Sequence, residues 1–172
     1  MNKKLMVLII TLFLSLSLVI ISLFGTIPMD KGKKVSDIIF LPNDDYEIGW
    51  FDESSKYNGL LNVKIDLLTL EEPATGEAFV VTYVMTYEVK PRNVTDNTVR
   101  YAVKDPIYND YVSFEEIENN NLNPNIKSVK IIVTLPQKSE EEIEILFIAD
   151  DSSGVENSFV LTLYEKRSET VN

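Results

Sequence analysis

Acidic side chains in turns are the first residues in this sequence that could do chemistry. Asp44-Asp45 comes just before a weakly predicted strand, and Asp150-Asp151 begins a turn before the last predicted strand. Carboxylates on loops suit Ca²⁺, which takes about six to eight oxygen ligands. The spacing does not match an EF-hand loop, and acidic turn residues commonly accept hydrogen bonds from their own backbone. We therefore expect no metal site, and keep these four aspartates as the Ca²⁺ candidates.

Catalytic chemistry has little support in the residue types. The chain has no histidine and no cysteine, which removes the commonest general base, thiolate nucleophiles and most zinc, copper and haem sites. Two carboxylates can hydrolyse a glycosidic bond, but a chain with 27 acidic residues offers such pairs by chance. The sequence contains no Gly-x-Ser-x-Gly motif and no glycine-rich phosphate loop. We expect a noncatalytic protein without a cofactor.

Aromatic side chains beside weakly predicted strands are the main binding candidates. Large amphipathic rings are common at protein interfaces, and they also stack on sugar rings. Trp50 has a competing structural role, because one large aromatic residue often fills the core of a β-sandwich. We expect Trp50 in the core, with a protein interface and a sugar platform as alternatives. The candidates for partner contact are Tyr46, Trp50, Phe51, Tyr101, Tyr108 and Tyr111.

A long apolar segment near the N-terminus predicts contact with a lipid bilayer. Leu5 to Phe24 carries no charge, and a helix of about 20 residues spans the roughly 30 Å hydrocarbon core of a membrane. A cleavable signal has a shorter apolar region, about 7–15 residues, followed by small residues. Here a bulky Leu23-Phe24 pair precedes Gly25. We expect an uncleaved single-pass anchor; a cleaved signal and a buried helix are the alternatives.

The charges that flank this anchor do not by themselves set its orientation. Lysines lie within residues 1–4 and also within 31–34, so the positive-inside rule nearly balances. The very short N-terminal tail and the acidic remainder of the chain favour a C-terminal domain outside the cytoplasm. Asn93-Val94-Thr95 adds a candidate glycosylation sequon at Asn93. The predicted location is the cell membrane, with the domain exposed outside.

Charge and composition also define the organisation of the chain. Its 172 residues have a net charge of −11, which disfavours nucleic acid as a partner. Without cysteine the domain must be stable without disulfides. We expect a basic cytoplasmic tail at 1–4, the anchor at 5–24, a linker at 25–36, a β-sandwich at 37–166 and a disordered tail at 167–172.

Hydrophobic residues beyond the linker alternate with period two, which is typical of strands with one buried face. The clearest strands are Leu61–Leu67, Ala78–Val89, Ser128–Leu135, Glu142–Ile148 and Ser158–Tyr164. The weaker ones are Asp37–Leu41, Tyr46–Phe51, Thr98–Val103 and Tyr108–Phe114. Seven to nine short strands in a chain of this size predict an all-β fold, an antiparallel two-sheet sandwich.

The segment from Ile143 to Lys166, IEILFIADDSSGVENSFVLTLYEK, resembles the final hairpin of immunoglobulin-like and fibronectin type III-like sandwiches. The resemblance implies that architecture only, because the Cys–Trp–Cys hallmark of immunoglobulin domains is missing.

These observations favour a noncatalytic, membrane-anchored domain that binds a protein partner or acts as a scaffolding or accessory subunit at the cell envelope. A surface-anchored module for carbohydrate or calcium is the alternative, and a carboxylate-based hydrolase is the third hypothesis.

Overall fold

The computed structural model describes residues 32–118 and 122–166. The predicted anchor at Leu5–Phe24 and the tails at 1–4 and 167–172 lie outside these residues. Over the described ranges, no helix is long and apolar enough to cross a bilayer. The fold described below is that of the unit that begins at Lys34.

The described residues form nine β-strands and two short 3-10 turns, which confirms the predicted all-β class. The strands are β1 (Asp37–Leu41), β2 (Glu47–Trp50), β3 (Leu61–Asp66), β4 (Phe79–Lys90), β5 (Val99–Val103), β6 (Val112–Ile117), β7 (Ile126–Leu135), β8 (Glu141–Ala149) and β9 (Glu156–Tyr164). The predicted strand at Tyr108–Phe114 starts too early. Asp105 caps a 3-10 turn at Pro106–Tyr108 by accepting a hydrogen bond from the Ile107 amide, so β6 begins only at Val112.

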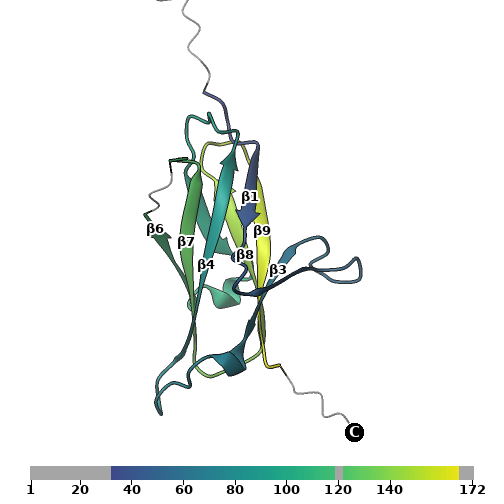
Figure 1. The fold of residues 1–172 in the computed structure, drawn as a ribbon, viewed down its shortest axis with the longest axis vertical. Helices are drawn as coiled ribbons and strands as arrows, with labels where there is room; N and C mark the ends of the chain where they lie inside the picture. Colours follow the sequence, from purple (N-terminus) through teal and green to yellow (C-terminus); the bar gives the residue numbers. More distant parts are fainter. Residues whose placement is uncertain (1–31, 119–121, 167–172) are drawn as a thin grey trace, which may run out of the picture. The chain divides into compact units, whose positions relative to one another are not determined.

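The strands belong to two sheets (Figure 1). One sheet has the order β1-β4-β7-β6, and the other has the order β2-β3-β9-β8-β5. All neighbours in the first sheet are antiparallel, as predicted. The second sheet corrects the prediction at one place, because β3 and β9 run parallel, with Val63 beside Leu161. A parallel pair needs a long crossover, and here most of the domain lies between the two strands.

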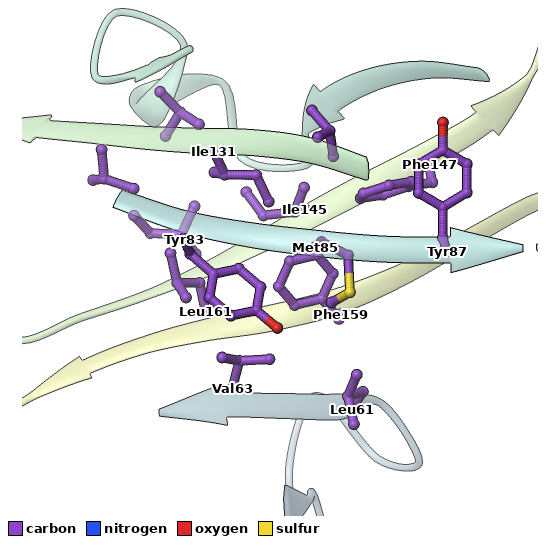
Figure 2. Packing of buried hydrophobic residues seen from close by; sticks show 14 of the residues in the cluster. Leu61, Val63, Tyr83, Met85, Tyr87, Ile131, Ile145, Phe147, Phe159 and Leu161 are labelled. Carbon is purple, nitrogen blue, oxygen red and sulfur yellow. The ribbon is translucent and has the colours of Figure 1, made fainter. Parts of the chain in front are cut away.

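The core lies between the two sheets, and β4 illustrates how it forms. Alternate residues of β4 from Phe79 to Val89 are buried, as the period-two pattern predicts. Figure 2 shows Tyr83, Met85 and Tyr87 on this face of β4, opposite side chains from β8 and β9. The Tyr87 ring meets the Phe147 ring of β8 edge-on, with centroids 5.0 Å apart. Such contacts join the two sheets through one hydrophobic cluster.

The two buried tyrosines of β4 differ in how their hydroxyl groups are satisfied. The Tyr87 hydroxyl lies 2.7 Å from the Tyr101 hydroxyl, which in turn donates to a Glu116 oxygen at 3.3 Å. The Tyr83 hydroxyl is buried and has no hydrogen-bond partner among the described residues. Burial raises the pKa of Tyr83 to about 12; the nearby backbone of Asn43 opposes this shift without reaching hydrogen-bond geometry.

We expect Tyr83→Phe and Tyr87→Phe to change stability in opposite directions. Tyr83→Phe removes a buried hydroxyl that makes no bond, so the free energy of unfolding should rise by about 1 kcal/mol. Tyr87→Phe breaks a buried hydrogen bond, so the free energy of unfolding should fall by about 1 kcal/mol. Urea unfolding followed by far-UV circular dichroism measures both. A loss of stability in Tyr83→Phe equal to that in Tyr87→Phe would show that the Tyr83 hydroxyl is well bonded.

Candidate partner-binding groove

The five-stranded sheet extends past the edge of the four-stranded sheet. β1, an edge strand of the four-stranded sheet, lies against β9: the Phe40 and Phe159 rings are 5.3 Å apart, and Asn157 Nδ2 donates to the Ile38 carbonyl at 2.7 Å. In the sheet order, β3 and β2 follow beyond β9. Among the described residues of the hairpin, the end of β2 is the part left open, because Trp50 is largely exposed whereas Leu61 and Val63 of β3 are buried. Figure 1 shows β3 and its loop projecting beyond β1.

The core-side face of this hairpin is apolar. Ile48 pairs directly with Val63, and Trp50 pairs directly with Leu61. Directly opposed residues in an antiparallel pair point to the same face. Val63 and Leu61 are buried in the core, so Ile48 and Trp50 also point to the core side of the sheet. Trp50 is nevertheless 71% exposed, because the four-stranded sheet ends before it reaches this position.

A groove of about 460 Å³ runs between β1 and the hairpin. We call it the β1–β2 groove. Its lining is mainly apolar, and Asp37 is its only charged residue. The apolar side chains used in the argument below are Phe40, Ile48, Trp50 and Leu60.

The backbone of β1 also faces this groove. In an antiparallel ladder, the backbone groups of successive residues alternate between the paired neighbour and the opposite side. The Ile38 carbonyl, which accepts from Asn157, points away from β4. Phe40 lies two residues further along, so its N–H and C=O point away from β4 as well. The β1–β2 groove therefore combines an apolar floor with outward backbone groups of β1 at its edge.

Trp50 is not a core residue, and this corrects the sequence-based expectation. The residues around it have different environments. Tyr46 is half-buried and packs edge-on against Tyr83, with ring centroids 5.0 Å apart. Phe51 is also half-buried and packs against Tyr57 at 5.1 Å. Of these three candidates for partner contact, Trp50 is the one with a largely exposed ring.

The second group of aromatic candidates lies far from the first in the sheet order. Tyr101 belongs to β5, which is the opposite edge of the five-stranded sheet from β2. Its ring stacks on Phe114 at 5.6 Å, and its hydroxyl is already bonded to Tyr87. The two groups therefore do not form one surface.

Tyr108 and Tyr111 lie between β5 and β6. The Tyr108 hydroxyl donates to a Glu141 carboxylate oxygen at 2.7 Å, and burial followed by this bond raises the pKa of Tyr108. Tyr111 is 37% exposed and contributes to a separate shallow hollow with Ile107. Tyr108 therefore has a structural role, and Tyr111 remains accessible.

The four Ca²⁺ candidates take part in local contacts. Asp45 bonds to Asn43, and Asp44 is exposed. Asp150 forms an ion pair with Arg100. Among the described residues, no three acidic side chains come together in a way that could hold a metal ion.

Asp151 links the start of the domain to the turn between β8 and β9. Its carboxylate accepts hydrogen bonds from the backbone amides of Val35 and Ser153. Burial alone would raise the pKa of Asp151, but bonds from Ser153 and Val35 outweigh it and lower the pKa. Lys34 adds a bond from its Nζ to the Ser152 carbonyl at 3.3 Å. Asp151 therefore has a structural role in this turn.

Asn93 is exposed in the turn that follows β4. Its position leaves the side chain accessible, and glycosylation there remains a prediction.

Comparison with known proteins adds no relative. No family model matches this chain, and no curated protein or solved structure matches it either.

Proposed function

We propose that this protein is a noncatalytic, membrane-anchored module whose β-domain binds a protein partner outside the cytoplasm. The observation that carries the proposal is the β1–β2 groove, in which Trp50 is 71% exposed on the side of the sheet where the core would otherwise continue. Exposed aromatic residues in apolar concavities are the usual anchors of protein interfaces. An apolar surface of this kind favours occupation by a partner.

The location in this proposal rests on the sequence. Leu5–Phe24 has the length and composition of a single membrane span, and the acidic domain follows it after a short polar linker. Accessible Asn93 in the sequon is compatible with a domain outside the cytoplasm.

The architecture we propose is an immunoglobulin-like sandwich with an added hairpin. The order β1-β4-β7-β6 corresponds to strands A-B-E-D of a constant-type immunoglobulin sheet, and β5-β8-β9 corresponds to C-F-G. In this interpretation the β2–β3 hairpin is the addition, placed next to the last strand. Domains of this architecture carry many functions, so the strand order supports the fold and the groove supports the function.

A protein partner has more support than a carbohydrate. Sugars present many hydroxyl groups, and sites that bind them need several polar side chains to satisfy those groups. The β1–β2 groove offers few, mainly Asp37, Asn157 and Ser158. Its apolar lining is better suited to the side chains of a protein.

Site-specific photo-crosslinking in intact cells tests the proposal. A photoreactive benzophenone amino acid replaces Trp50 in the full-length protein, and the matched control carries it at Ile107, which is 65% exposed on another surface. We expect a defined crosslinked species from position 50 and none of the same mass from position 107. Added protease should also digest the domain in intact cells. Identical crosslinking patterns from both positions, or a domain fully protected from protease, would contradict the proposal.

A further inference from the structure

We infer that the partner inserts an extended strand into the β1–β2 groove, antiparallel to β1, as a fifth strand of the four-stranded sheet. This inference deepens the proposed partner binding and rests on it. The argument uses three features of the groove: the outward backbone groups of β1, its apolar floor and its charge.

The outward backbone groups of β1 provide the bonds for strand addition; among them the Ile38 carbonyl already accepts one bond from Asn157. The bond from Asn157 shows that the Ile38 carbonyl points away from β4. Phe40 is two residues further along β1, so its N–H and C=O have the same direction, into the groove. An exposed edge of this kind is a template for another strand. Natural domains often protect such edges with charged side chains. Here Asp37, at one end of β1, is the only charged residue that lines the groove, so the rest of this edge lacks that protection. An antiparallel strand continues the pattern of the whole four-stranded sheet.

The floor of the groove explains which side chains the strand would carry. The four-stranded sheet has one strand fewer than the five-stranded sheet, and the β2–β3 hairpin extends beyond the edge of the four-stranded sheet. A strand added to β1 lies over the open β2 end of the hairpin, so its inward side chains contact Ile48, Trp50 and Leu60. Inward side chains occur at every second residue of a strand. The ligand is therefore an extended peptide with apolar residues at alternate positions.

A second copy of this chain does not fit by pairing of β1 with β1. Two antiparallel strands in one sheet are related by an axis perpendicular to the sheet, so the five-stranded sheets of both copies would lie on the same side. Each of these sheets extends two strands beyond its own β1, and the two extensions would occupy the same space. A single strand from a different protein avoids this overlap.

The charge of the groove indicates which residue type the peptide carries at one end. Asp37 is the first residue of β1, and no lysine or arginine lines the groove. An antiparallel strand places its C-terminal end beside Asp37. The domain belongs to a chain with a net charge of −11, so a basic residue at that end is favoured by both local and overall charge. The ligand class is an extended, alternating apolar peptide with a basic C-terminal end.

A synthetic nonapeptide of alternating valine and threonine with a C-terminal lysine tests the inference. The chain has a single tryptophan, so the fluorescence of Trp50 reports directly on the groove. We use the full-length protein in lipid nanodiscs and expect a saturable blue shift of the emission as the peptide covers Trp50. Ile48→Ala should weaken the peptide several-fold, while the matched control Ile107→Ala should leave its affinity unchanged.

N-methylation of the peptide backbone tests the pairing itself. Ile38 and Phe40 point their side chains inward and their backbone groups into the groove. In an antiparallel strand, the residues opposite them also point inward and form the hydrogen bonds with β1, so the valines make these bonds and the threonines do not. Methylating the valine nitrogens should weaken binding about tenfold or more, and methylating the threonine nitrogens should change it less than about twofold. Equal losses in the two methylated peptides, or a loss confined to the methylated threonines, would overturn the antiparallel strand addition.

The charge argument and the competing occupants are tested in the same titration. Asp37→Asn should weaken the lysine-ended peptide, and exchanging its terminal lysine for glutamate should weaken it further. A Trp50 emission that is already blue-shifted in the peptide-free protein, and that shifts to the red when residues 1–31 are deleted, would assign the groove to the chain's own N-terminal segment and overturn the inference. Peptide binding that disappears as the protein is concentrated would instead indicate a second copy and overturn it too.

The two proposals can fail separately. If the crosslink at position 50 remains specific but the two methylated peptides bind equally, partner binding stands and strand addition is wrong. If the specific crosslink is also lost, both proposals are wrong.

Discussion

Replacing Phe147 with alanine is expected to lower the free energy of unfolding by about 3–5 kcal/mol. Phe147 is completely buried on β8, at the place where side chains of both sheets meet. Its ring lies 5.0 Å from each of the Phe40, Tyr87 and Tyr101 rings. Alanine would remove all these contacts. It would leave a cavity among β1, β4, β5 and β8, and these strands could fill it only by moving. The cost is a large part of the roughly 5–15 kcal/mol by which an ordinary domain is stable.

Urea unfolding of the full-length protein in detergent, followed by far-UV circular dichroism, measures this loss. Phe51→Ala is the matched control, because Phe51 is half-buried and, among the described residues, its ring contacts only the Tyr57 ring. Its expected cost is about 1 kcal/mol. If Phe147→Ala prevents folding, Phe147→Leu should still fold with a smaller loss. Equal losses for Phe147→Ala and Phe51→Ala would show that the core is not centred on Phe147.

Replacing Asn125 with alanine is expected to cost about 2–3 kcal/mol, although the residue is polar and small. Asn125 is 2% exposed just before β7. Its Nδ2 donates to the Arg92 carbonyl at 2.6 Å, and its Oδ1 accepts from Asn97 Nδ2 at 2.9 Å. Alanine would leave the Arg92 carbonyl without this partner and Asn97 Nδ2 with only its bond to the Pro124 carbonyl, and it would remove the buried amide that joins the two segments.

A double-mutant cycle with Asn97→Ala separates the two hydrogen bonds. Asn97→Ala alone should cost less than Asn125→Ala, because the part-buried bond to Arg92 remains and the other bond that Asn97 makes, to the Pro124 carbonyl, is exposed. The double variant should cost less than the sum of the single variants, since both remove the same Asn97–Asn125 bond. Thermal unfolding by circular dichroism gives the three values. Strict additivity would mean that the two side chains do not interact in solution.

The sequence predicted most of the fold because the relevant information is local. Period-two alternation identifies β4 and its buried face from Phe79 to Val89, and it also identifies β7, β8 and β9. The start of β6 was wrong because a capped turn at Asp105 competes with the strand. The parallel pairing of β3 with β9 was missed, since alternation along a strand carries no information about its neighbour.

The candidate site was predicted in part. The expected place of Trp50 in the core was wrong, and its contact with a partner stays a prediction. Whether a core-side residue is covered depends on where the opposite sheet ends, and that is a property of strand order. The Asp37 and Phe40 side of the groove was missed for the same reason. The alternation of Tyr46, Ile48 and Trp50 was the available signal, because it gives a short strand with an apolar face.

The position of β9 has a consequence for how the domain is made. This last strand lies in the middle of its sheet, between β3 and β8. β3 is synthesised about 90 residues before β9. Until β9 follows, the sheet lacks the strand that joins the β2–β3 half to the β8–β5 half. The sheet therefore becomes continuous only after β9 has been synthesised. Until then the edges of β3 and β8 that pair with β9 remain open to other strands.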